Sequence, residues 1–131
     1  MGLDNGIMIR RNGKITKIYD KIKHFEDDWD KEHKYDFEIA YWRKCWNVRG
    51  LIANCLGGIY DCGDTPIARE QIPLIIEALK KLNEKNWIED GGSIWDFEEQ
   101  KPFIDQHIKN LKYIYELMSE YDLDIYFYDS Y

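Results

Sequence analysis

Cysteine is scarce in this chain, and long apolar runs are absent. The three cysteines, Cys45, Cys55 and Cys62, are an odd number whose spacing matches neither a paired zinc motif nor a secreted disulfide framework. No stretch approaches the roughly 20 apolar residues of a membrane span, and the first residues lack the apolar segment of a signal peptide. We therefore expect reduced thiols in an intracellular protein that has no structural metal and no membrane anchor.

Complete catalytic and cofactor-binding motifs are also missing. The glycine pairs Gly57-Gly58 and Gly91-Gly92 lack the remaining residues of a phosphate-binding loop. Cys62 has no histidine partner nearby in the sequence, and His33 lies among acidic residues without the pattern of a calcium-binding loop. The sequence therefore predicts no cofactor, no metal and no catalytic residue, and it favours a binding protein over an enzyme.

Basic residues are fewer than acidic ones. The chain has 18 Lys and Arg against 25 Asp and Glu, which gives a formal net charge of −7 at pH 7. Direct nucleic-acid binding is disfavoured, because phosphates would be repelled unless a local basic patch overcame the repulsion. The acids concentrate between Glu26 and Asp36 and again after residue 116. Such an acidic surface complements a basic partner, although ordinary solvated surface explains the same charges.

Apolar and aromatic residues are abundant. At 131 residues, with 44% hydrophobic and 15% aromatic content, the chain is long enough to form a single domain, residues 1–131, that folds around a core without disulfides. The aromatics also supply surface positions, where Tyr and Trp favour interfaces. A second copy of the chain is therefore one partner that the sequence allows.

The N-terminal part contains an Asn12-Gly13 dipeptide between isoleucine-rich runs. Asn-Gly suits the positive φ angles of a type I′ turn, so the sequence predicts a β-hairpin over Ile7–Ile18. A helix beginning at Ile15 competes with this interpretation, because isoleucines 15, 18 and 22 also recur near helical spacing. We favour the hairpin.

Strand and helix patterns then alternate along the chain. Apolar alternation predicts a strand at Asp36–Trp42, and a helical stripe runs from Arg43 to Gly57-Gly58, whose glycines end the helix. A second helical region is predicted to open at Asp64-Thr65-Pro66, with Pro73 in its first turn or at a kink.

The C-terminal part predicts a turn at residues 90–93, a third helix over residues 100–121 and a strand over Leu123–Tyr128. Together these patterns indicate an α+β fold. We expect a small, mainly antiparallel sheet, made of the N-terminal hairpin, the central strand and the C-terminal strand, covered by about three helices.

The segment Tyr41–Arg49 concentrates cations and indoles within an acidic protein. A helix beginning just after Trp42 would favour an anion through its free amides and dipole, and a tryptophan can stack on a base. The alternative places the tryptophans in the core and pairs the cations with nearby acids. The predicted anion or ligand site consists of Arg43, Lys44, Arg49, Trp42 and Trp46.

Single residues elsewhere also have structural and functional interpretations. His107 falls on an apolar helical stripe, which favours a hydrogen-bonded core histidine. Asp61 and Asp64 either form a carboxylate pair that holds a cation or serve as turn and cap residues. The aromatic residues expected to stay uncovered at the C-terminal strand are Tyr126, Tyr128 and Tyr131.

Two short signatures, Met1–Ile7 and Tyr41–Trp46 with Arg49, resemble small, uncharacterised bacteriophage and prophage proteins. The resemblance implies no established activity. It does imply an accessory protein in the cytoplasm of an infected bacterial cell, where such proteins block host enzymes or capture host signals.

Two functions from different classes follow. The first, which we favour, is a binding protein that inhibits a host macromolecule, such as a component of antiviral defence, through an acidic surface. The second is a small-molecule-binding protein that sequesters, or less readily cleaves, a nucleotide-like anionic signal at Arg43, Lys44 and Arg49.

Overall fold

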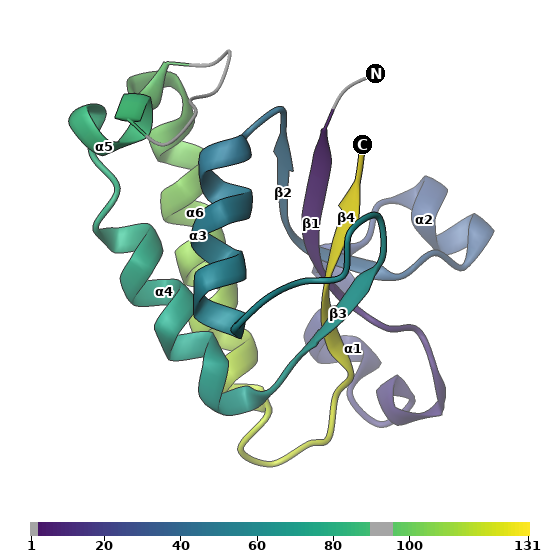
Figure 1. Ribbon diagram of the computed structural model, residues 1–131. Helices are drawn as coiled ribbons and strands as arrows, with labels where there is room; N and C mark the ends of the chain where they lie inside the picture. Colours follow the sequence, from purple (N-terminus) through teal and green to yellow (C-terminus); the bar gives the residue numbers. More distant parts are fainter. Residues whose placement is uncertain (1–2, 90–95) are drawn as a thin grey trace.

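A four-stranded antiparallel sheet with helices packed along one face forms the body of the protein (Figure 1). The computed structural model describes residues 3–89 and 96–131. The sheet has the order β2-β1-β4-β3, and its strands are β1 (Asp4–Ile9), β2 (Phe37–Arg43), β3 (Asp64–Ile67) and β4 (Ile125–Ser130). The helices that cover one face are α3 (Trp46–Leu56), α4 (Ile72–Lys80) and α6 (Phe97–Leu117). The predicted α+β class is confirmed.

Shorter helical segments complete the described chain. They are η1 (Gly13–Ile15), α1 (Tyr19–Ile22), η2 (Lys23–Phe25), α2 (Asp28–His33), η3 (Arg69–Gln71) and α5 (Glu84–Glu89). In Figure 1, α2 projects from the side of the sheet away from α3, α4 and α6. The turn predicted at residues 90–93 lies outside the described residues.

The N-terminal strand β1 lies in the middle of the sheet. It pairs with β2 on one side and with β4 on the other, antiparallel in both cases. Asn5, Ile7 and Ile9 are completely buried on the side of the helices, because alternate side chains of a strand point to the same face. The opposite face carries the residues between them.

The predicted β-hairpin at Asn12-Gly13 is wrong. Asn12 instead caps η1, where its side-chain oxygen accepts a hydrogen bond from the Lys14 amide at 3.0 Å. The two edges of β1 are taken by β2 and β4, so the residues after Gly13 have no free strand edge to pair with. They form short helical turns whose buried residues, as the competing helical interpretation expected, are Ile15, Ile18 and Ile22.

The middle of the chain largely follows the predicted pattern. β2 forms where the alternation indicated, and α3 ends as predicted at Gly57, whose φ of 74° is left-handed. The predicted start of this helix just after Trp42 is wrong, because Arg43 is the last residue of β2, Lys44 has a left-handed φ of 55° and the helix begins at Trp46. Pro73 lies in the first turn of α4. The predicted helix start at Asp64-Thr65-Pro66 is wrong, because these residues belong to β3. This strand is at the edge of the sheet, where a proline without an amide donor is tolerated.

The core lies between the sheet and the three helices and includes Phe37, Trp42 and Phe127. His107 of α6 packs edge-on against Trp42, with ring centroids 4.9 Å apart. The Nδ1 atom of His107 and the Nε1 atom of Trp42 have no hydrogen-bond partner. His107 therefore packs against the core and is partly buried, and it lacks at Nδ1 the hydrogen bond that was expected.

The cysteines are unpaired thiols, as expected. Cys45 is buried, Cys55 is half-buried and Cys62 is exposed. Within the described ranges, no helix combines the length and apolar character needed to cross a membrane.

Burial of His107 makes stability depend on pH. Burial lowers the pKa of His107 to about 4, from 6.5 in the unfolded chain, because the charged ring is poorly solvated. Between these values the unfolded state binds more protons, so the free energy of unfolding should fall by about 2 kcal/mol between pH 7 and pH 5. Urea unfolding of the His107→Leu variant at both pH values should show the loss of this contribution. The control His33→Gln, at an exposed histidine, should keep it.

Candidate functional site

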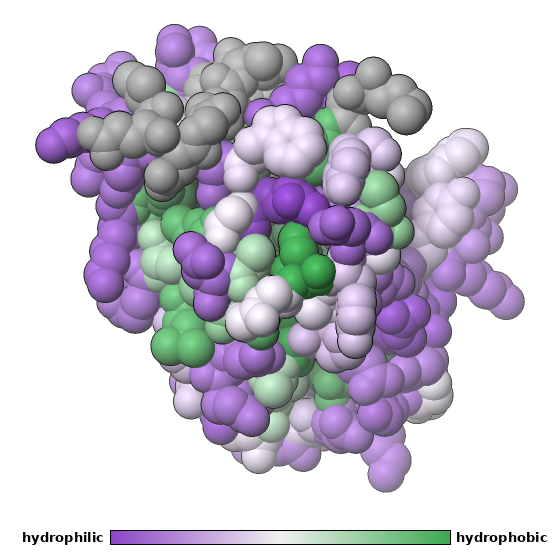
Figure 2. Space-filling view, in the orientation of Figure 1, coloured by the Kyte–Doolittle hydropathy of each residue, from purple (hydrophilic) through white to green (hydrophobic). Residues whose placement is uncertain are grey.

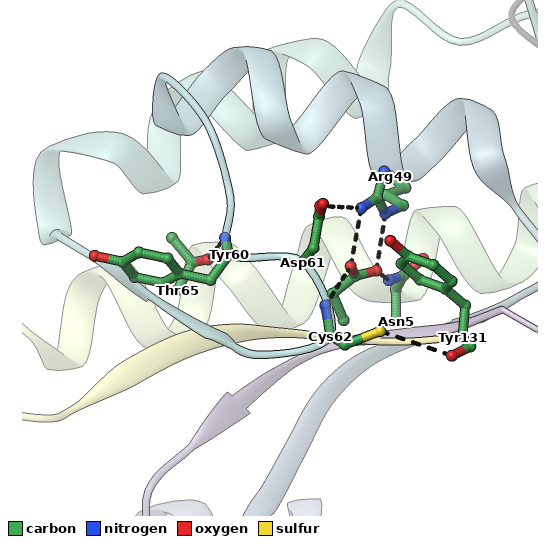
Figure 3. Close-up of polar contacts among 8 residues, drawn as sticks. Asn5, Arg49, Tyr60, Asp61, Cys62, Thr65 and Tyr131 are labelled. Atoms are coloured by element: carbon green, nitrogen blue, oxygen red, sulfur yellow. Dashed lines mark hydrogen bonds and ion pairs between the residues drawn. The ribbon is translucent and has the colours of Figure 1, made fainter.

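Arg49 and Asp129 form a buried ion pair between α3 and β4. The Asp129 side chain is 0% exposed, although it is a carboxylate. Arg49 donates from Nε to Oδ1 at 2.8 Å and from Nη2 to Oδ2 at 2.9 Å (Figure 3). Two parallel charge-assisted hydrogen bonds of this kind fix both the position and the orientation of the guanidinium group.

Two further segments, β1 and the loop before β3, converge on this pair. The Asn5 side chain of β1 donates to Asp129 Oδ1 at 2.6 Å, and the backbone amide of Cys62 donates to Oδ2 at 3.1 Å. Asp61, in the loop before β3, accepts a second hydrogen bond from Arg49 Nη2 at 2.8 Å. Figure 3 shows Asn5, Arg49, Asp61 and Cys62 gathered together. The cluster therefore ties the first strand, the last strand, α3 and the 57–63 loop together.

The charges in this cluster stabilise one another. Burial by itself would raise the pKa of Asp129, but the hydrogen bonds from Arg49, Cys62 and Asn5 hold the pKa below its usual range. The hydrogen bond to Asp129 is the main reason that the pKa of Arg49 is raised still further. Because Asp61 adds a second carboxylate, the positive charge of Arg49 is matched within the fold.

The structure separates the residues of the predicted anion site. Trp46 and Arg49 come together, with the guanidinium carbon 5.5 Å from the Trp46 ring centroid. Trp42 is only 2% exposed and belongs to the core. Arg43 stands opposite Asp4 in the β1–β2 register, and the Lys44 backbone amide donates to the Leu3 carbonyl oxygen at 2.6 Å.

The outer side of the Arg49 cluster is aromatic. The centroid of the Tyr131 ring lies 5.3 Å from the Arg49 guanidinium carbon and 5.6 Å from the centroid of the Trp46 ring. Both rings are close to half exposed. Cys62 has a left-handed φ of 50°, and its thiol lies 3.6 Å from the Tyr131 carbonyl oxygen. Asp61 and Asp64 were hypothesised to hold a cation as a carboxylate pair. In the structure, Asp61 forms an ion pair with Arg49, and Asp64 forms one with Arg10.

The sheet has a second surface, which we call the open sheet face, on the side away from α3, α4 and α6. Its side chains are mainly carboxylates and tyrosines. They come from Asp4 and Met8 of β1, Glu38 and Tyr41 of β2, and Tyr126 and Tyr128 of β4, while Gly6 leaves a gap in β1. Two arginines are also on this face: Arg43, which stands opposite Asp4, and Arg10, which lies over the Tyr126 ring. The Tyr41 hydroxyl donates to Asp4 Oδ1 at 2.6 Å, which joins two of these strands through their outward side chains.

Helix α2 adds acidic and aromatic residues beside the open sheet face. Desolvation and the nearby carboxylates of Asp30 and Asp27 raise the pKa of Glu38, so the two elements share one negative region. Trp29 is 61% exposed, and its ring contacts that of His33 in a tilted arrangement, with the centroids 4.0 Å apart. We call α2, Asp27 and the open sheet face together the acidic side.

Figure 2 shows the contrast between this region and the helices. Apolar residues gather over α3 and α4, whereas hydrophilic residues dominate the flank where α2 lies. Within residues 3–89 and 96–131, no group of three or more His, Cys, Asp or Glu side chains is arranged to hold a metal ion.

Some residues of the open sheet face can be predicted from the sequence. The acidic run before Asp36 and the tyrosines of the last strand are visible in the sequence. The roles of Asp4 and Gly6 are not, because both depend on which strands flank β1. The expectation that Tyr126 stays uncovered is wrong, because Tyr126 is buried at 8% exposure, beneath Arg10. Tyr128 is partly exposed and Tyr131 is exposed.

Comparison with known proteins finds no matching family model and no similar curated protein or solved structure.

The Arg49–Asp129 cluster should be essential for stability. Replacing Arg49 by Met keeps an apolar stem of similar length but leaves the Asp129 carboxylate buried without its cation. We expect the free energy of unfolding to fall by about 3–5 kcal/mol, measured by urea unfolding at pH 7. The control Lys17→Gln removes one exposed cation and should cost less than about 0.5 kcal/mol. An Arg49→Met variant as stable as this control would contradict a structural role.

Proposed function

We propose that the protein is a non-enzymatic binding protein whose acidic side covers a basic surface of another protein. The observation that carries this proposal is the open sheet face. In the described part of the chain, the long helices α3, α4 and α6 cover the opposite face of the sheet, while this one presents tyrosines among carboxylates next to the short acidic helix α2. Tyrosine supplies contact area with a polar tip, and carboxylates complement cations, which together suit a protein interface.

The like-charged neighbourhood of Glu38 supports this use. Asp27 and Asp30 each destabilise the charged form of Glu38, so a cation placed among the three carboxylates would relieve their repulsion. The same arrangement repels nucleic acid. A basic protein surface is therefore the partner of matching chemistry.

The alternative function, capture of a nucleotide-like anion at Arg43, Lys44 and Arg49, has less support. Arg49 is matched by Asp129 and Asp61, and a ligand phosphate would have to displace them. Trp42 is too deeply buried to stack on a base. The resemblance to small bacteriophage and prophage proteins supports a bacterial host protein as the partner and inhibition as the outcome.

The proposal predicts that binding depends on the position of the acids and not only on their number. We compare the variant Asp27→Asn/Asp30→Asn/Glu38→Gln with the control Glu77→Gln/Asp105→Asn/Glu116→Gln, whose acids lie on α4 and α6. Both remove three negative charges, and Asn at position 27 can still cap α2. The immobilised proteins are incubated with bacterial lysate, and bound proteins and nucleotides are identified by mass spectrometry.

We expect a discrete basic protein on the wild type and on the control, with affinity for the acidic-side variant reduced about tenfold or more. Release should occur as salt rises above physiological strength, because screening weakens exposed charge pairs. Equal retention by both triple variants, or recovery of nucleotide alone, would contradict the proposal.

A further inference from the structure

Gly6 brings two tyrosines of the open sheet face close together. In the sheet register it stands between Tyr41 of β2 and Tyr128 of β4. A Cβ atom at Gly6 would overlap the Tyr128 ring and would lie 2.9 Å from the Ala40 carbonyl oxygen. The Tyr128 ring therefore rests on the backbone of β1, in a place that only glycine leaves open. Its position is fixed by the sheet.

The next tyrosine along β4 shows what such a ring binds. The Arg10 guanidinium carbon lies 4.3 Å from the Tyr126 ring centroid, and Arg10 also pairs with Asp64 at 3.6 Å. Arg69 lies over the Tyr115 ring at 4.0 Å, and its Nε donates to the Tyr115 carbonyl oxygen at 3.1 Å. The Arg10 contact thus shows that a tyrosine ring with a carboxylate beside it binds a guanidinium group within this fold.

Tyr128, like Tyr126, lies among carboxylates. Burial raises the pKa of Tyr128, and the carboxylates of Glu38 and Asp4 raise it further. Asp4 is engaged by the Tyr41 hydroxyl and stands opposite Arg43. Of the two carboxylates near Tyr128, Glu38 therefore lies in the more negative surroundings, because it is close to the acids of α2.

We propose that Tyr41, Tyr128 and Glu38 form a binding site for the guanidinium group of one arginine of the partner protein. This inference rests on the proposed function, since it names the side chain that the acidic side receives. Arginine fits better than lysine, because a planar guanidinium stacks on an aromatic ring and still presents N–H donors to a carboxylate. A lysine ammonium forms the ion pair without the stacking.

Two peptides of equal charge test the site. Acetylated and amidated hexa-arginine and hexa-lysine are titrated into the ¹⁵N-labelled protein at constant physiological ionic strength. We expect hexa-arginine to bind about three- to fivefold more tightly, the size of an exposed cation–π interaction. Its largest amide shifts should fall on Gly6, Tyr41 and Tyr128. Equal affinity for the two peptides, or shifts centred on another segment, would overturn the arginine site.

Matched variants separate this site from general charge attraction. Tyr128→Leu should reduce the preference for hexa-arginine to less than twofold, whereas Tyr60→Leu, at an exposed tyrosine of the 57–63 loop, should leave it unchanged. If Tyr128→Leu does not fold, Glu38→Gln serves in its place. Glu38→Gln should weaken hexa-arginine binding more than Glu77→Gln does, and equal losses would overturn the site.

The outcomes also distinguish this inference from the proposed function. If the peptides bind equally well and both weaken in the Asp27→Asn/Asp30→Asn/Glu38→Gln variant, the arginine site is overturned and the acidic binding side stands. If neither peptide binds and the same variant retains host proteins as well as its control does, both proposals are overturned.

Discussion

The buried carboxylate of Asp129 is the group on which the packing of β1, β4, α3 and the 57–63 loop depends. A charge removed from water is costly unless hydrogen bonds and an opposite charge replace its solvation. Here that replacement comes from β1, α3 and the 57–63 loop, which are far apart in the sequence. The last strand, the first strand and the first long helix must therefore be assembled together before Asp129 is satisfied. The positive charge of Arg49 is therefore neutralised inside the fold by its ion pair with Asp129.

This arrangement divides the sheet between two purposes. The face toward α3, α4 and α6 is apolar and contains the core, apart from the polar cluster at one end. The open sheet face has few apolar side chains, and its tyrosines are positioned by hydrogen bonds and by the close contact with Gly6. Side chains held in place before binding lose less conformational entropy when a partner arrives. The rigidity of the sheet thus supports the binding role that we propose.

The two short signatures of the sequence lie on adjacent strands. Leu3 to Ile7 runs beside Ala40 to Lys44, joined by the backbone hydrogen bond from Lys44 to Leu3 and by the Tyr41–Asp4 contact. Cys45 is buried, and its thiol donates to the Arg43 carbonyl oxygen at 3.3 Å. Many residues of these signatures are therefore needed to pair β1 with β2, whatever partner the protein binds.

The sequence by itself determined the α+β class, β2, α3 with its Gly57 end, α6 and β4, because each is specified by local periodicity or a local stop signal. Tertiary structure decided the rest. Asn12-Gly13 is a strong hairpin signal, but β1 bonds with two distant strands, and long-range pairing outweighed the local turn. Asp64-Thr65-Pro66 has the form of a helix start, yet β4 recruits it as an edge strand. Likewise, Arg49 carries no local mark of its partner, since Asp129 lies 80 residues away and only the folded sheet brings their charges together.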